Sequence, residues 1–177
     1  YLDSANTFSS TVAFNSGGTL ADVTINDSND FDFAALALSG NLITTSMGGS
    51  ITDSGALAIS GSSSFTTSAS NKDITLDITN NAFAGAVTLS TTGSTGNATV
   101  DGGTTQLDIA ASTVGGNLTL TSGHATGITD SGTVTVGGNL IATNDVSNGD
   151  ISMGTLAVAG TVSLTTSGAS GNATVVN

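Results

Sequence analysis

The sequence predicts an all-β fold, a parallel β-solenoid (β-helix) of about seven coils. Three observations support this prediction: an amino-acid alphabet that disfavours helices, a repeat of about 22 residues, and short stretches in which apolar and polar residues alternate. A coil of about 22 residues has room for two or three short strands, each paired in parallel with its equivalent one coil away. With about 4.8 Å between paired strands, seven coils form a rod roughly 30 Å long.

The composition disfavours α-helix throughout the chain. Of 177 residues, 56 are Ser or Thr and 24 are Gly, and all 13 acidic residues are Asp. The chain has no Glu, Arg, Pro, Cys or Trp. Ser, Asn and Asp compete with a helix by bonding the local backbone, whereas Val, Ile and Thr favour strands. We therefore expect almost no helix.

Internal repeats are visible at two lengths. The segment 51–55, Ile-Thr-Asp-Ser-Gly, recurs at 128–132, and the segment 96–100, Gly-Asn-Ala-Thr-Val, recurs at 171–175. These offsets of 77 and 75 residues indicate a duplicated block of roughly 76 residues. A finer unit is marked by Gly116, Gly138 and Gly160, which lie 22 residues apart, each followed by Asn-Leu or Thr-Val.

The alternation between these anchors predicts which side chains face the core. In stretches such as Leu118-Thr119-Leu120 and Thr133-Val134-Thr135-Val136, the apolar residues are expected to point inward and the threonines outward. Thr fits the outward positions because β-branched side chains pack well on a flat sheet.

The coil corners carry a recurring Asn next to Gly. Asn41, Asn117 and Asn139 occupy equivalent places in the repeat, so we expect them to stack into a ladder of mutually hydrogen-bonded amides. The neighbouring Gly is expected to supply a positive φ at the corner.

A competing fold is a pair of antiparallel β-sandwich modules of about 76 residues each. Sandwiches usually carry a buried aromatic nucleus and longer alternating strands. This chain has one Tyr, no Trp and six Phe, and its alternating stretches are short. The repeat length favours the solenoid.

Three segments carry a resemblance to a known class of protein. The segments 115–123, 137–143 and 159–168 resemble the repeats of large bacterial exoproteins of the filamentous haemagglutinin and autotransporter-passenger kind. The resemblance covers residues 36–177. It implies a right-handed parallel β-helix, a place on the cell surface or in the secreted space, and a role in adhesion, aggregation or matrix building. Residues 1–35 match less well and are expected to form a divergent first coil, a cap or a connector, ahead of a solenoid repeat region at 36–177.

Charge and hydropathy exclude several partners. The formal net charge is -12, and Lys72 is the single Lys or Arg, so the chain lacks the basic residues that bind nucleic-acid phosphates or anionic lipids. The longest apolar run, Phe33 to Leu38, is six residues, far short of the roughly 20 that a membrane span needs. We predict no nucleic-acid partner and no membrane insertion.

No constellation of residues predicts catalysis. The lone imidazole, His124, sits in a Gly-flanked turn, and a Ser-His-Asp mechanism needs a rigidly held histidine. The Asp residues lack the aromatic and basic partners that saccharide-cleaving sites use. We predict no enzymatic activity, no catalytic residues, no cofactor-binding residues and no resident cofactor.

Two oxygen-rich turns are the candidates for calcium. The segments 27–32 and 144–150 resemble loose calcium loops, but neither has the Gly and the bidentate acid at the positions of an EF-hand. Asp is common in turns because its side chain bonds the backbone two residues on. We interpret both segments as solvated turns, with calcium as the alternative.

Two functional hypotheses follow from this sequence. The first is a non-enzymatic structural rod, either an adhesin shaft or a subunit of an extracellular filament or matrix, which associates end to end or continues into a longer chain. The second is an adhesin module that binds a surface glycan or receptor. Its signature is a cluster of aromatic or basic residues that interrupts the repeat, and the sequence shows no such cluster.

Overall fold

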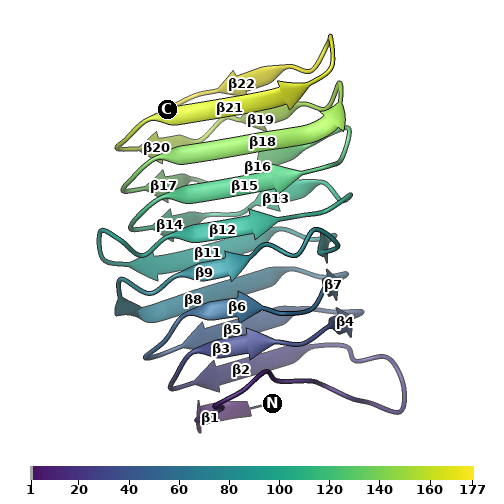
Figure 1. Ribbon diagram of the computed structural model, residues 1–177, viewed down its shortest axis with the longest axis vertical. Coiled ribbons are helices and arrows are strands. Elements are labelled where there is room, and N and C mark those ends of the chain that lie inside the picture. Colours follow the sequence, from purple (N-terminus) through teal and green to yellow (C-terminus); the bar gives the residue numbers. More distant parts are fainter. Residues whose placement is uncertain (1) are drawn as a thin grey trace.

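The computed structural model describes residues 2–177, with side chains from Ser4 onward, as a stack of parallel strands without any helix in that range (Figure 1). This confirms the predicted all-β solenoid. Front strands run to the right and back strands to the left while the chain rises from the N-terminus, so the coil is right-handed (Figure 1). The strands are β1 (Leu2–Asn6), β2 (Val23–Asp27), β3 (Phe31–Phe33), β4 (Leu36–Leu38), β5 (Leu42–Ser46), β6 (Ile51–Asp53), β7 (Leu57–Ile59), β8 (Ser63–Ser70), β9 (Ile74–Leu76), β10 (Ala82–Phe83), β11 (Val87–Thr92), β12 (Ala98–Asp101), β13 (Leu107–Ile109), β14 (Ser112–Val114), β15 (Leu118–Ser122), β16 (Ile128–Asp130), β17 (Val134–Val136), β18 (Leu140–Ser147), β19 (Ile151–Met153), β20 (Leu156–Val158), β21 (Val162–Ser167) and β22 (Ala173–Val175).

Three parallel sheets run along the rod. Sheet A has 12 strands on the path β1-β2-β5-β8-β11-β13-β16-β19-β22, with β14, β17 and β20 branching from it. Sheet B has seven strands, from β3 to β21, and sheet C has three, β4, β7 and β10. The path along sheet A completes about eight turns, one more than the seven predicted.

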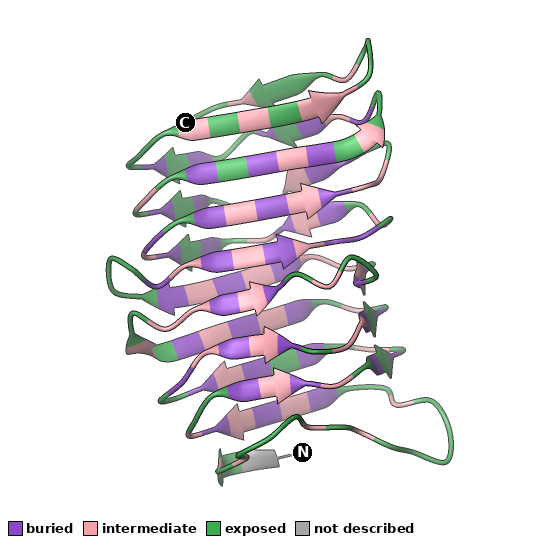
Figure 2. Ribbon diagram, in the orientation of Figure 1, coloured by how far each residue is buried: buried purple, intermediate pink, exposed green. Residues whose placement is uncertain are grey.

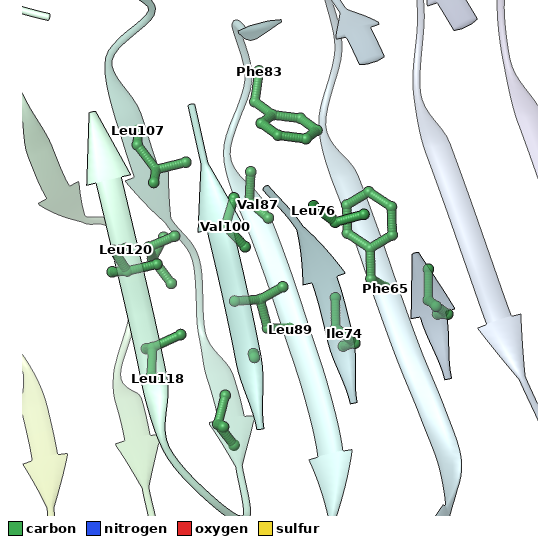
Figure 3. Close-up of a cluster of buried hydrophobic side chains, with 14 of the residues drawn as sticks. Phe65, Ile74, Leu76, Phe83, Val87, Leu89, Val100, Leu107, Leu118 and Leu120 are labelled. Carbon is green, nitrogen blue, oxygen red and sulfur yellow. The ribbon is translucent and has the colours of Figure 1, made fainter. Parts of the chain in front are cut away.

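The predicted inward and outward positions are confirmed. Leu118 and Val136 are buried, Thr119 is half-buried and Thr135 is exposed. Most strands show the same alternation, which appears as purple and pink or green bands in Figure 2. Leu, Ile and Val side chains from facing sheets fill the space between them (Figure 3). Each buried aliphatic side chain contributes about 1.5–3 kcal/mol to folding.

Phenylalanine is concentrated at the N-terminal end of this core. Five of the six Phe residues form a chain of edge-to-face ring contacts with centroid distances from 4.7 to 6.3 Å. Edge-to-face packing places the positive rim of one ring against the negative face of the next. The chain of rings runs in the order Phe8, Phe31, Phe33, Phe65 and Phe83.

The strand pattern repeats after ten strands rather than after a whole number of turns. Strands β2 to β11 form the first unit and β12 to β21 the second, and each strand matches the one ten places later. The eight-residue strands β8 and β18 are one such pair. The strands β6 and β16, both with the sequence Ile-Thr-Asp, are another. Because a regular turn holds three strands, a unit of ten covers three turns and one further strand.

The extra strand moves the second unit to another side of the rod. The longer strands β2, β5, β8 and β11 of the first unit lie in sheet A, whereas their equivalents β12, β15, β18 and β21 lie in sheet B. In Figure 1 the first set runs along the back and most of the second along the front. At the junction, β11 pairs with two short strands, β13 and β14, and sheet C ends at β10.

The N-terminal segment enters the stack step by step. Between β1 and β2 the chain makes two isolated bridges, Val12 to Phe33 and Leu20 to Leu38. Strands β2 and β3 then stack in register on β5 and β6. The regular part of the solenoid therefore begins at Val23.

Candidate functional site

A continuous ladder of side chains lines the corner that precedes sheet B. At each rung, a side-chain oxygen accepts the backbone N–H of the equivalent residue one turn later, at 2.7 to 3.1 Å. The acceptor is a carboxylate at some rungs and a hydroxyl or an amide at others, because each rung requires only a side-chain oxygen that can accept the N–H. We call this set the corner ladder; its rungs are Asp30, Ser50, Asp73, Asn97, Asn117, Asn139 and Thr161.

Asn117 and Asn139 stack at one corner as predicted, but the prediction is wrong for Asn41 and for the type of hydrogen bond. Asn41 lies at the corner before sheet A, where its backbone N–H donates to Asp22 at 2.7 Å and its Oδ1 accepts from Ser62 at 2.9 Å. The shift of one strand between the two units separates these repeat-equivalent residues. The bonds also differ from the expected ones, because each runs from backbone nitrogen to side-chain oxygen rather than between amides.

The corner glycines serve a different purpose from the predicted one. Positive φ occurs in the described residues at Gly93, Gly103, Gly127 and Gly168, and at two Asn, but not at Gly116 or Gly138. A Cβ on Gly138 would lie 2.4 Å from the Asn117 Oδ1 and 2.8 Å from a backbone oxygen. At Gly116 and Gly138, close approach between turns rather than a positive φ therefore requires the absence of a side chain.

Buried polar side chains near the ends of the longer strands hold the corner loops. The single Ser46 hydroxyl proton is shared between the carbonyls of Asn29 and Gly49, and Ser122 Oγ donates to that of Thr105. Asn144 Nδ2 donates to the carbonyls of His124 and Asp150, at 3.0 and 2.9 Å. These bonds satisfy loop carbonyls that would otherwise be costly to bury.

The carboxylates of the two candidate calcium turns accept hydrogen bonds from the chain. In the segment 27–32, Asp27 is fully buried and accepts the N–H groups of Phe8 and Asn29, while Asp30 belongs to the corner ladder. In the segment 144–150, Asp150 accepts the N–H of Asn172 at 2.8 Å. Among the described side chains, from Ser4 onward, the His and acidic residues form no group of three that could hold a metal ion.

The isolated histidine takes part in a local turn. His124 Nδ1 accepts the backbone N–H of Thr126 at 3.1 Å, and its backbone N–H donates to Ser122 Oγ.

Among the described residues, 2–177, no helix is long and apolar enough to cross a bilayer.

Three aspartates along sheet B have shifted pKa values. Burial raises the pKa of Asp53, against the opposing hydrogen bonds from Asn81 and from the backbone of Asp77. Burial likewise raises the pKa of Asp101, and the charges of Asp145 and Asp77 add to the shift. The pKa of Asp32 is lowered: burial opposes its ionisation, but hydrogen bonds led by that from Ser54 outweigh burial.

The last turn exposes apolar surface at the C-terminal end of the rod. Val162, Leu164 and Val175 pack against the core but stay half-buried. Their register partners one turn earlier, Leu140, Ala142 and Met153, are fully buried. The apolar residues of the last turn thus have the pattern of core residues without a turn above them.

The sequence of residues 20–90 and 95–147 matches a family described as repeats of unknown function (DUF5649). The chain belongs to this repeat family. The two DUF5649 matches are separated by residues 91–94, which span the end of β11 and the turn before β12, where the first unit gives way to the second. No curated protein and no solved structure matches the chain.

Proposed function

We propose that this chain is a non-enzymatic structural rod of the bacterial cell surface or extracellular space, serving as an adhesin shaft or as a subunit of a filament or matrix. The observation that carries the proposal is the stack itself, in which sheets A and B and the corner ladder continue in register from turn to turn. The open strand edges of such a stack pair with a further turn, supplied by a continuing chain or by a second copy. The resemblance of the repeats to exoproteins supports the location.

The charge distribution supports growth along the axis rather than sideways. The net charge of -12 makes neighbouring rods repel laterally at pH 7. The residues that cover the last turn, by contrast, are the uncharged Val162, Leu164, Val175 and Val176, of which Val176 is 60% exposed. Association at this end therefore buries the apolar side chains of the last turn.

Electron microscopy of the purified chain at neutral pH and low salt tests this proposal. We expect continuous threads, and we expect Val175→Asp to leave short rods, because a charge on the end face opposes stacking. Thr135→Asp adds the same charge at an exposed strand position away from both ends and is the matched control. Short, separate wild-type rods, or threads that survive Val175→Asp, would contradict end-to-end association.

Acidification provides a second test of the same arrangement. As the pH falls toward 4 the lateral repulsion disappears, because the isoelectric point is about 4.1. The raised pKa values of Asp53 and Asp101 mean that protonation of these groups favours the folded state as the pH falls through their folded pKa values. The stabilisation by Asp32, whose pKa is lowered, is lost only below the ordinary Asp range. Light scattering should rise while the β-type circular dichroism persists; unfolding at pH 4 would contradict this.

A further inference from the structure

A pocket near the N-terminal end of the rod brings together residues that are far apart in the sequence. It has a volume of about 320 Å³ and is lined by Phe8, Ser9, Asn29, Asp30, Gly48 and Lys72. Phe8 belongs to the segment before the regular stack, and Lys72 is the only lysine or arginine of the chain. An aromatic ring and a base therefore interrupt the repeat at one place, which is the signature that the linear sequence did not show.

The pocket is held in shape by the surrounding structure. The ring of Phe8 packs edge to face on the buried Phe31 with centroids 5.9 Å apart, and its backbone N–H donates to the buried Asp27 at 3.0 Å. The backbone carbonyl of Lys72 accepts from the buried Thr67 Oγ1 at 3.1 Å. A site whose walls are fixed before binding loses less conformational entropy when a ligand enters.

Asp30 and Gly48, which also line the pocket, are held in place by contacts between turns. Asp30 Oδ1 accepts the N–H of Ser50 at 2.7 Å as the first rung of the corner ladder, which orients this carboxylate beside the pocket. Gly48 approaches the preceding turn so closely that a Cβ would lie 2.3 Å from the Ser28 carbonyl oxygen. The absence of a side chain there lets the backbone of this wall lie close against the preceding turn.

The polar groups of the pocket favour a neutral ligand rather than an ion. An anion attracted to Lys72 meets the carboxylate of Asp30 and a chain of net charge -12, whereas a cation attracted to Asp30 meets the Lys72 ammonium. Together with Asn29 and Ser9, these residues provide both hydrogen-bond donors and acceptors. Adjacent hydroxyl groups, each a donor and an acceptor, complement such a mixed set.

The aromatic ring narrows the ligand class further. The face of an aromatic ring is electronegative and attracts the weakly positive C–H groups of an apolar face. A pyranose ring combines such a C–H face with a rim of hydroxyl groups. We propose that this pocket binds one neutral pyranose unit of a saccharide, with the C–H face on Phe8 and the hydroxyl groups on Asp30, Lys72 and Asn29.

Saturation-transfer NMR with methyl glycosides of glucose, galactose, mannose and N-acetylglucosamine tests the proposal on the whole chain. We expect transfer to at least one of these sugars with millimolar affinity, as a shallow site for one sugar unit implies. Phe8→Leu keeps an apolar side chain on Phe31 but removes the ring face, and Lys72→Met keeps the aliphatic stem but removes the ammonium. Each variant should weaken binding at least tenfold.

Two controls make the experiment decisive. Phe14→Leu alters another partly buried aromatic residue of the same N-terminal segment, outside this pocket, and should leave binding unchanged. Circular dichroism checks that each variant keeps its β-structure. The proposal is overturned if no neutral sugar shows transfer, if the folded Phe8→Leu and Lys72→Met variants bind as the wild type does, or if only charged uronates bind. Thread formation is measured separately, so the rod function stands or falls independently.

Discussion

The two ten-strand units share one strand pattern but differ in their cores. In the first unit, Phe65 of β8 faces Thr44 of β5 across the ladder of backbone bonds. At the equivalent place in the second unit, Ala142 of β18 faces Leu120 of β15. A bulky residue beside a small one in the first unit is thus replaced by two aliphatic residues in the second. Cores tolerate such exchange when the total volume and the inward pattern are kept.

The comparison separates what the fold requires from what it tolerates. Both units keep inward apolar positions, polar groups near the ends of longer strands and close corners at Gly. They differ in the aromatic content of the core and in the sheet that carries the longer strands. The backbone register and the corner contacts therefore define the solenoid, and the choice of core side chain is secondary.

The largest expected effect comes from placing a charge at an inward position of the second unit. Leu118→Asp should lower the free energy of unfolding by several kcal/mol and unfold neighbouring turns, because it buries an unpaired carboxylate. Val136→Asp should behave in the same way. Thr119→Asp and Thr135→Asp change the outward neighbours and should cost far less. Urea unfolding monitored by circular dichroism measures the difference, and equal losses at both sets would contradict the assignment of faces.

A smaller effect is expected at a ladder corner. Gly138→Ala should destabilise the chain by about 1–3 kcal/mol, because the added methyl group overlaps the Asn117 side chain and a backbone oxygen of the preceding turn. Gly154→Ala is the matched control, since nothing lies within 4 Å of a Cβ at that position. The control should be neutral or stabilising by up to about 1 kcal/mol. Thermal unfolding compares the two, and a harmless Gly138→Ala would remove the argument from close approach.

The smallest effect addresses the core difference directly. Thr44 is fully buried and its hydroxyl has no hydrogen-bond partner in the described structure, whereas its equivalent in the second unit is Leu120. Thr44→Val removes the unsatisfied group at nearly constant volume and should stabilise the first unit by about 1 kcal/mol, or about 2–4 °C in Tm. Thr45→Val, at the adjacent half-buried position, should have little effect. A destabilised Thr44→Val would indicate that this hydroxyl is satisfied in solution.

Much of the fold could be predicted because its signals are local. The alternation around Leu118 and Val136 identifies the inward face, and the spacing of Gly116, Gly138 and Gly160 gives the length of a turn. The sequence does not predict the chain of Phe rings, because the six Phe residues are scattered along the chain and meet only when the turns stack. The repeat predicts the wrong corner for Asn41 for a related reason. The offset of 76 residues between Asn41 and Asn117 does not correspond to a whole number of turns, and the number of strands per turn is not visible in the sequence.

The pocket could not have been found from the sequence. Phe8 and Lys72 are separated by three turns' worth of chain, and neither belongs to a recognisable motif. They line one pocket because the chain after β1 stacks on the corner that follows β2, where the Phe8 N–H donates to Asp27. The corner ladder, by contrast, can be predicted in part from the sequence, because a polar residue with a side-chain oxygen immediately precedes every strand of sheet B.

The mismatch between ten strands per unit and three strands per turn also bears on how the chain avoids misfolding. Repetitive sequences risk pairing a strand with the wrong copy of its partner, since a near-identical segment offers similar contacts. Here a slip by three whole turns moves a strand of sheet B by nine strands in the sequence rather than ten, so that the eight-residue β18 would have to occupy the place of the three-residue β9. The duplicated segments thus resemble one another in sequence without being interchangeable in the stack, and the correctly registered coil keeps an energetic advantage over its slipped alternatives.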